Sequence, residues 1–537
     1  MKPKTGLAVV ISCIVWFVYI RWFAPPPPKP VVPQNQTAEK PAVTAIAPQQ
    51  PTVGTLGSPL FNGQVALDEA AALDLAKLFL KFSSNGGKPA EITLKEYKEK
   101  VSRDAPQIAL VSPSLSSYSL GTIFTDAQLS EFSFGRYELK RERDGTVELI
   151  KQNGGLSVTK QYRVGSDYMI DATYRIQFPN TQKNDWGALS IPVGASTVEF
   201  DQNDPLKSWE VVFSQNDSVS RHTADKLPEQ EKIFQGNTQW LSFGNRYFSA
   251  VLINESEINP DIVLVKEKNF AGAYLRYPLK AKPGQILNIK QKIFAGPKDY
   301  NELSKLKGLT ALIDYGTFSF LAYPLLLLLK FFYTYFHNYG VAIILLTLVV
   351  RGLFYPLSLK SYRSMKSMQK LQPQIAALKE KYKDDKEKLS REQIALFKTH
   401  KVNPAGGCVP MLIQLPVFIA LYAVLANSIE LFHAPFFGWI HDLSSKDPYY
   451  VYPILMGVSM LLQQKLTPSV GMDPMQVKMM YIMPVVFTFI MLNLPSGLTM
   501  YIFVSTILGV LQQWAMTKEP HRDTAAVVSA KPTPEKG

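Results

Sequence analysis

The sequence predicts a polytopic α-helical membrane protein with six transmembrane helices and one large exported domain, an antiparallel β-sandwich. Long apolar runs fill the C-terminal part of the chain, whereas residues 55–310 have the mixed composition of a water-soluble domain. The Lys and Arg residues behind the net charge of +13 gather in a few short segments of the 537-residue chain. Because short loops rich in Lys and Arg stay in the cytoplasm, these segments determine the topology.

The first 24 residues predict an uncleaved signal anchor. Lys2 and Lys4 precede an apolar span that only Arg21 interrupts, near its end. At about 1.5 Å per residue, this span can cross a bilayer of about 30 Å. A proline run follows it in place of a small-residue cleavage site. Lipoprotein processing at Cys13 is the alternative, but the longer apolar stretch follows this cysteine instead of preceding it.

A linker is predicted between the anchor and the exported domain. Residues 25–54 are rich in proline and have no hydrophobic period, which is typical of an extended and flexible segment. The two cysteines of the chain, Cys13 and Cys408, both lie in apolar stretches. No disulfide framework is therefore predicted, and the exported domain depends on its own hydrophobic core.

Residues 55–310 contain many short segments of alternating polar and apolar residues, which predict a large β-sandwich. The clearest hairpin is at 137–150, where Asp144-Gly145 is typical of a type I′ turn between two strands. Residues 68–84 are the exception, because their apolar residues follow a helical period. A helix is expected there.

The most basic segment fixes the order of the membrane crossings. Residues 358–404 contain twelve Lys or Arg and five Asp or Glu, and are therefore expected in the cytoplasm as a helical hairpin. A single crossing must then separate them from the exported domain. The apolar stretch 317–338 is accordingly predicted to lie on the outer membrane interface as an amphipathic helix, which suits its Pro324 and Lys330.

Five crossings are predicted after the exported domain, and with the anchor they make six. The last apolar run is divided in two because Pro495, Ser496 and Gly497 are typical of a tight turn. This order leaves both termini in the cytoplasm, the C-terminal one as a tail at 517–537. The predicted crossings are residues 341–357, 408–429, 449–466, 479–494 and 496–516.

One of these crossings contains Arg351 in an otherwise apolar run. An arginine at the centre of a membrane helix is unfavourable by about 2.5–3.5 kcal/mol. Thr347, Arg351 and Tyr355 are spaced by four and share one helical face. Polar residues also form stripes on other crossings, among them Gln414, Ser459, Gln463, Asn493, Tyr501, Ser505, Gly509 and Gln512.

Two interpretations of Arg351 follow from this pattern. The polar faces can enclose a hydrated, positively charged cavity, since ionisable residues inside membranes normally face a bundle interior or water. Alternatively, Arg351 extends its side chain to the cytoplasmic headgroups, about six residues away. Helical spacing favours neither. If the cavity exists, we expect Thr347, Tyr355, Gln414, Asn493, Tyr501 and Ser505 to line it around the charge of Arg351.

Several kinds of chemistry lack their sequence patterns. No acidic residue lies at the middle of a predicted crossing, and the chain has no P-loop, no Gly-x-Ser-x-Gly and no His-Glu-x-x-His. His433 and His441 lie near Asp442 in an outer loop, where ordinary loop residues are a better interpretation than metal ligands. The chain is therefore not expected to be an enzyme or to hold a cofactor, metal or nucleotide.

The cytoplasmic segment is expected to contact partners. Met365 and Met368 begin an apolar stripe, and methionine adapts to varied apolar surfaces. Its dense positive charge would attract anionic lipid or ribosomal RNA, although a merely solvated charged face explains it too.

Four stretches of the membrane region resemble the Oxa/Alb family of membrane protein insertases in its Gram-negative YidC form. They are VVRGLFYPLSLKSYRSMKSMQKLQPQI, KVNPAGGCVPMLIQLPVFIALY, IHDLSSKDPYYVYPILMG and LPSGLTMYIFVST. The resemblance covers nearly the whole chain. It implies an inner-membrane chaperone and insertase with a periplasmic β domain. The partners that it implies are nascent membrane proteins, the Sec translocon, the ribosome and the lipid bilayer.

The resemblance also implies roles for single residues. Arg351 matches the one arginine of a groove that opens to cytoplasm and lipid but is closed to the periplasm. Thr347 and Tyr501 match groove and substrate-contacting positions, whereas Ile502 stands where some relatives have a second tyrosine. The alternative function is a channel or transporter with a cationic pocket and an exported sugar-binding domain. A passive envelope scaffold is a third, and no inverted repeat supports a transporter.

Overall fold

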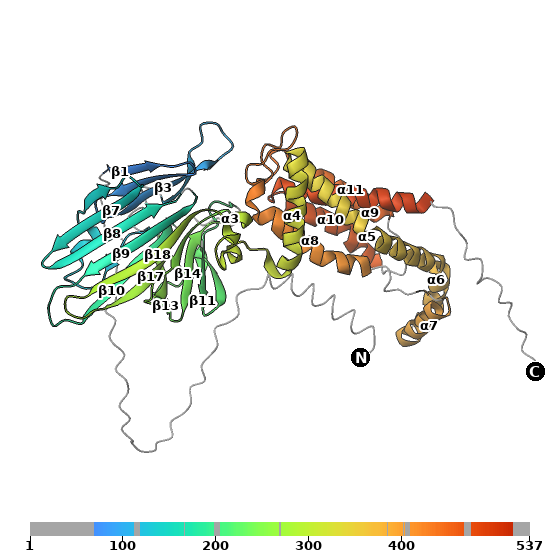
Figure 1. Cartoon of the computed structure of the whole chain (residues 1–537). Helices are drawn as coiled ribbons and strands as arrows, with labels where there is room; N and C mark the ends of the chain where they lie inside the picture. The colour runs from blue at the N-terminus through green and yellow to red at the C-terminus, as the bar shows by residue number, and fades with distance from the viewer. Residues whose placement is uncertain are drawn as a thin grey trace, which may run out of the picture. The chain divides into compact units, whose positions relative to one another are not determined.

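The computed structural model describes residues 69–111, 119–165, 167–197, 204–267, 270–383, 385–400, 402, 409–466 and 474–518 (Figure 1). Strands occupy the first half of this range and helices the second. The predicted anchor at 1–24, the linker at 25–54, Cys408 and the tail beyond residue 518 lie outside the described residues.

Three antiparallel sheets form the β domain. The nine-stranded sheet has the order β12 (Ser218–Thr223), β11 (Glu210–Gln215), β14 (Thr238–Gly244), β15 (Phe248–Asn254), β18 (Ile286–Pro297), β9 (Met169–Gln177), β8 (Leu156–Val164), β7 (Thr146–Asn153) and β6 (Glu138–Arg141). The five-stranded sheet has the order β13 (Lys232–Phe234), β16 (Asp261–Glu267), β17 (Phe270–Lys280), β10 (Asp185–Thr197) and β5 (Ile123–Phe124). The four-stranded sheet consists of β1 (Glu69–Asp74), β2 (Leu78–Ser83), β3 (Lys88–Lys98) and β4 (Gln107–Val111).

The five-stranded and nine-stranded sheets pack face to face, since β10 and β17 of the five-stranded sheet contact β14 of the nine-stranded sheet. The core between layers follows from side-chain alternation along each strand. In β9, for example, Ile170, Ala172, Tyr174 and Ile176 are buried while their neighbours are not. The predicted antiparallel β-sandwich is confirmed.

The helix expected at 68–84 is wrong. The structure has β1 and β2 there, paired as a hairpin that continues into β3. Leu78, Leu80 and Phe82 of β2 alternate with less buried residues and are at most 1% exposed. Ala, Leu and Lys favour helices locally, but the pairing and burial available in a sheet override that preference.

The hairpin between β6 and β7 is present, but its turn differs from the predicted type I′. That turn requires positive φ at both central residues. Among Asp144 and Gly145, Gly145 alone has it, at 84°. The Glu142 N–H donates to the Thr146 carbonyl at 2.9 Å, which makes a three-residue loop with glycine in the left-handed position. Asp144 accepts from the Thr146 N–H instead of entering that region.

The helical region begins after β18. Its longer helices are α4 (Ser319–Phe336), α5 (Tyr339–Lys370), α6 (Gln372–Lys381), α7 (Lys386–Thr399), α8 (Val409–Asn427), α9 (Val451–Leu466), α10 (Pro474–Met491) and α11 (Ser496–Lys518). Short helical turns after β18 are α3 (Tyr300–Ser304), η3 (Leu309–Leu312), η4 (Gly316–Phe318) and η6 (Ile429–Leu431). Two others, α2 (Glu131–Phe134) and η2 (Ala224–Lys226), lie within the β domain. The α11 helix packs against α5, α8 and α9, whereas α10 packs against α9 and α4 against α5 and α8.

Helix α5 is longer than the span predicted at 341–357. It continues through Pro356 to Lys370, so Met365 and Met368 lie on its last turns and not on the hairpin. The hairpin itself consists of α6 and α7, and the Asp385 carboxylate caps α7 by accepting from the Lys388 N–H at 2.9 Å.

Three described helical stretches are long and apolar enough to cross a membrane, namely Gly316–Phe336, Tyr339–Lys370 and Ser496–Met516. Ile413–Asn427 and Val477–Met491 are shorter apolar helices. The first stretch includes α4, which the charge argument assigns to the outer interface, so that placement stays a prediction. Lys330 of α4 does not face lipid alone, because its ammonium lies 2.5 Å from the Glu430 carboxylate.

Acid should weaken the β domain through Glu210, a nearly buried residue of β11. Burial alone would raise its pKa, but Lys298, at 2.7 Å, and Arg221 hold the pKa below its ordinary value. A carboxyl whose folded-state pKa is lowered contributes stability above its ordinary pKa, and loses it as the pH falls through the folded-state value. Glu210→Gln should therefore flatten the acid dependence of thermal unfolding and cost about 3–5 kcal/mol at neutral pH, since Lys298 is left buried without its partner.

The measurement is thermal unfolding of the full chain in detergent, followed by the circular dichroism of the sheets across an acid pH series. Glu138→Gln is the matched control, because Glu138 forms an exposed ion pair with Lys140. An unchanged acid dependence in Glu210→Gln would contradict the assignment.

Candidate groove around Arg351

The Arg351 side chain forms a hydrogen bond to a neighbouring helix. From the middle of α5, its Nε donates to the Ser505 hydroxyl of α11 at 3.0 Å. The side chain is half-buried. Ser505 is 7% exposed, so this hydrogen bond lies inside the helical bundle. A cation in an apolar helix thus faces a polar group and not lipid, as intramembrane ionisable residues normally do.

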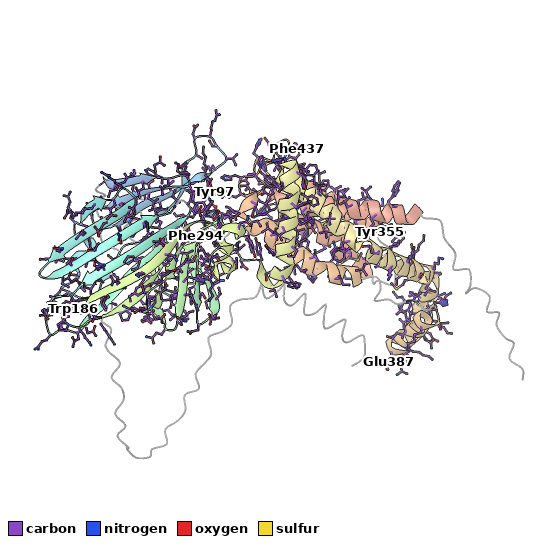
Figure 2. The ribbon with its side chains drawn as sticks, viewed as in Figure 1. Tyr97, Trp186, Phe294, Tyr355, Glu387 and Phe437 are labelled. Carbon is purple, nitrogen blue, oxygen red and sulfur yellow. The ribbon has the colours of Figure 1, made fainter. Side chains whose placement is uncertain are left out.

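The predicted face of α5 places its three polar residues in different surroundings. Thr347, one turn before Arg351, is 1% exposed, and its hydroxyl donates to the Ile343 carbonyl of the same helix at 2.6 Å. Tyr355, one turn after Arg351, is 39% exposed and carries a label on α5 in Figure 2. The face therefore changes from packed to open along the helix.

Helix α11 supplies the opposite wall. Tyr501 is 2% exposed, interacts with Ser505 and Arg351, and lies against Phe418 of α8 with ring centroids 6.3 Å apart. Gly509 follows Ser505 by one turn. A Cβ built on Gly509 would lie 2.8 Å from Gln463 Nε2 of α9 and 3.4 Å from Arg351 Nη2. The charge is therefore surrounded by groups from three helices.

Helices α5, α9 and α11 run in the same direction, which places Arg351, Gln463 and Ser505 at a similar distance from one end of the bundle. Ile343 of α5 contacts Gly497 at the start of α11, and Arg351 contacts Ser505 further along, so the two helices are parallel. Tyr452 of α9 lies by Phe503, with ring centroids 6.1 Å apart, so α9 begins at the same end. Arg351 is roughly 18 Å along α5 from its start at Tyr339. That end is the one capped by the loop at 428–450.

The loop at 428–450 closes one end of the bundle through two aspartates. Asp442 accepts from the backbone N–H groups of His433 and Ser444 and from the hydroxyls of Ser444 and Ser445. Asp447 accepts from Trp439 Nε1 and from the backbone N–H groups of Tyr449 and Tyr452. Charge-assisted hydrogen bonds of this kind are the strong ones.

The same loop binds the first residues of α11. The Ser496 N–H donates to the Ser445 carbonyl at 2.7 Å, and the Gly497 N–H to the Leu443 carbonyl at 2.9 Å. The Ser496 hydroxyl donates to the Asp442 carbonyl. These bonds satisfy N–H groups that a helix N-terminus would otherwise leave without a partner. These hydrogen bonds fix the loop across the start of α11.

Two candidate residues lie apart from Arg351 or at the edge of its surroundings. Asn493 is exposed in the loop between α10 and α11, roughly 13 Å along the helix axis from Ser505. Gln414 is half-buried on α8, one turn before Phe418. Because α8 ends in the loop that caps the start of α11, the two helices are antiparallel, and Gln414 lies near the depth of Ser505.

Sequence reasoning missed the closing role of Asp442 and Asp447. The segment DLSSKD could have indicated this role, because an aspartate shortly before serines often accepts a hydrogen bond from the backbone two residues further on. No group of three or more His, Cys, Asp or Glu that could hold a metal occurs in the described part of the chain. His433 Nε2 lies 3.8 Å from Asp442, and burial lowers the pKa of this histidine, so the pair belongs to the loop closure.

Comparison with known proteins identifies the family. Residues 72–328 match the model of the YidC periplasmic domain, and residues 331–523 match that of the 60Kd inner membrane protein. Membrane protein insertase YidC of Geotalea uraniireducens is 39% identical over 541 residues, covering 96% of this chain and 99% of that protein. The insertase YidC of Syntrophus aciditrophicus is 38% identical over 553 residues, covering 97% and 100%.

The chain belongs to the YidC family of membrane protein insertases. It is accordingly an inner-membrane protein with a periplasmic β domain, and its family is one of insertases, not enzymes. The crystal structure of an active YidC insertase with its first transmembrane domain resolved is 19% identical, with a TM-score of 0.36, and covers 85% of this chain and 96% of that one.

Removing the Asp442 carboxylate should open the sealed end of this YidC-family bundle. Each hydrogen bond to a charged group contributes about 1.5–3 kcal/mol, and Asp442→Ala removes four of them. Thr499, which is 0% exposed behind the loop, should then become accessible from outside. A cysteine at position 499, in a chain with Cys13 and Cys408 replaced by serine, should react with a membrane-impermeant maleimide at least about tenfold faster in Asp442→Ala.

His441→Ala is the control for this experiment, because His441 is an exposed residue of the same loop. Equal labelling rates in Asp442→Ala and in the parent would show that Asp442 does not hold the closure.

Proposed function

We propose that this chain inserts and folds inner-membrane proteins through a hydrated groove around Arg351. The groove opens to the cytoplasm and to lipid and is closed at the periplasmic end by the loop at 428–450. The observation that supports this most is the half-buried Arg351, paired with Ser505 inside an otherwise apolar bundle whose outer end is sealed.

The physical role of the charge follows from its depth. A polar tail of a substrate has to cross about 30 Å of hydrocarbon in a plain bilayer. A hydrated groove that reaches Arg351 shortens this apolar path. The guanidinium attracts an acidic residue in the tail and so lowers the cost of desolvating it. Burial of about 20 apolar residues of the substrate in lipid then supplies the driving force, and no nucleotide is needed.

Apolar side chains flank the groove and give the substrate helix a route into lipid. Ile419 of α8 is 38% exposed and Val458 of α9 is 59% exposed. Such apolar surfaces are normal towards lipid. The substrate would pass its apolar segment along these helices while its tail interacts with Arg351.

The remaining parts of the chain suit the same function. We place six spans, the interfacial helix at 317–338 and both termini as the charge rule requires, with the termini in the cytoplasm. The basic hairpin of α6 and α7, with Met365 and Met368 at the end of α5, would receive substrates from the ribosome. The Sec translocon is the partner expected for larger substrates, and a channel or transporter has no observation in its favour.

Arg351→Ala should impair substrates with an acidic tail selectively. The test uses proteoliposomes that contain only this protein, and a single-span substrate whose short tail carries one Asp or, in a second version, Asn. Loss of a charge-assisted contact worth about 1.5–3 kcal/mol predicts a roughly tenfold or larger drop in insertion of the Asp version. The Asn version should change little.

Arg351→Lys is the informative comparison, because lysine keeps the charge but lacks the planar guanidinium that reaches Ser505. It should retain part of the activity. Equal loss of insertion for the Asp and Asn substrates in Arg351→Ala would contradict the proposed role of the charge.

A further inference from the structure

Gly509 lies where Arg351 approaches α11 most closely. A Cβ at this position would be 3.4 Å and 3.5 Å from Nη2 and Nη1 of Arg351. It would also be 2.8 Å from Nε2 of Gln463, closer than real Cβ contacts allow. The Gln463 amide therefore lies too close for a Cβ, and the guanidinium lies at van der Waals distance from the Cβ position, where a side chain longer than a methyl group can reach it.

Other glycines of these helices are also closely packed, but Gly340 faces Phe436 and Gly457 faces Thr488, whereas Gly509 faces Arg351. Gly352 on α5 has no heavy atom within 4 Å of its Cβ position. A glycine in a helix interior costs about 1 kcal/mol relative to alanine. At Gly509 the glycine lies beside Arg351, the only guanidinium inside the described helical bundle. The absence of a side chain there lets this guanidinium approach the backbone of α11.

We propose that Gly509 is a positioning residue that sets the depth of the Arg351 charge and thereby the preference for substrates with acidic tails. This inference rests on the proposed function of the groove. Two contacts fix the guanidinium on α11: the hydrogen bond from Nε to Ser505 and the packing of its two Nη atoms on Gly509. They hold the charge inside the bundle, one turn from Ser505 and level with Gln463.

A bulkier side chain at position 509 would displace this charge without removing it. The long aliphatic side chain of arginine lets the guanidinium move towards the cytoplasmic headgroups when another side chain occupies the space beside the backbone at position 509. An acidic residue would then meet the charge at a shallower depth and would have to cross more hydrocarbon unpaired. Gly509→Val should therefore reduce insertion of acidic-tail substrates while neutral-tail substrates are inserted as before.

The test measures insertion of the Asp-tail and Asn-tail substrates by full-length Gly509→Val in proteoliposomes. The expected result is a loss for the Asp tail that approaches that of Arg351→Ala, with no loss for the Asn tail. Gly352→Val is the matched control, since it places the same β-branched side chain in a membrane helix where there is open space. It should leave both substrates unaffected.

A double-mutant cycle separates a role through Arg351 from a general packing defect. If Gly509 acts by positioning Arg351, adding Gly509→Val to Arg351→Ala should cause no further loss. Additive losses, or equal losses for both substrates, would overturn the inference. If the valine variant does not accumulate as folded protein, Gly509→Cys serves instead, because its side chain is smaller than valine but extends one atom beyond the Cβ position that already lies 3.4 Å from Arg351 Nη2, and its loss must show the same selectivity.

The outcomes also distinguish this inference from the proposed function. If Arg351→Ala leaves the acidic-tail substrate unaffected, the groove function itself fails. If Arg351→Ala impairs it selectively but Gly509→Val does not, the groove function holds and only the positioning role of Gly509 is wrong.

Discussion

Placing one guanidinium inside an apolar helical bundle is the constraint on which the membrane region depends. An arginine in lipid costs about 2.5–3.5 kcal/mol on insertion scales. The structure offsets this cost with the Ser505 hydroxyl on α11, the Tyr501 hydroxyl that interacts with Ser505, and a side-chain-free position at Gly509. These three residues are four positions apart and form one face of a single helix. That face explains why α11 packs against α5, α8 and α9 together.

The loop at 428–450 holds negative charges at the end of the bundle where α11 begins. Asp442 and Asp447 accept hydrogen bonds from N–H and hydroxyl groups of their own loop. The loop carbonyls then bind the first N–H groups of α11. Helix α11 thus has two roles. Its first turn is bound to the loop at 428–450, and its next turns face Arg351. This arrangement is the basis for the proposed groove that is open on one side only.

Much of this could be predicted from the sequence, wherever a local pattern decides the structure. Alternation along β9 predicted a buried face, and the spacing of Thr347, Arg351 and Tyr355 predicted a shared face of α5. Prediction failed where pairing between segments decides against local preference. The segment at 68–84 became two strands because β1 pairs with β2 and β2 pairs with β3. The contacts of Gly509 and the hydrogen bonds of Asp442 depend on residues that only the folded bundle brings together, and no periodicity encodes them.

Site-specific photocrosslinking during insertion tests the central claim most directly. A photoreactive phenylalanine would replace Tyr355, which is 39% exposed on the face of Arg351, whereas Tyr501 is shielded by Phe418. The control replaces Leu353, which is 73% exposed on another face of the same helix. With a ribosome-bound single-span substrate, crosslinks from position 355 should form early, when only the tail has emerged, and precede any from position 353. Crosslinks that appear equally at both positions, or at neither while insertion proceeds normally, would contradict passage along the Arg351 groove.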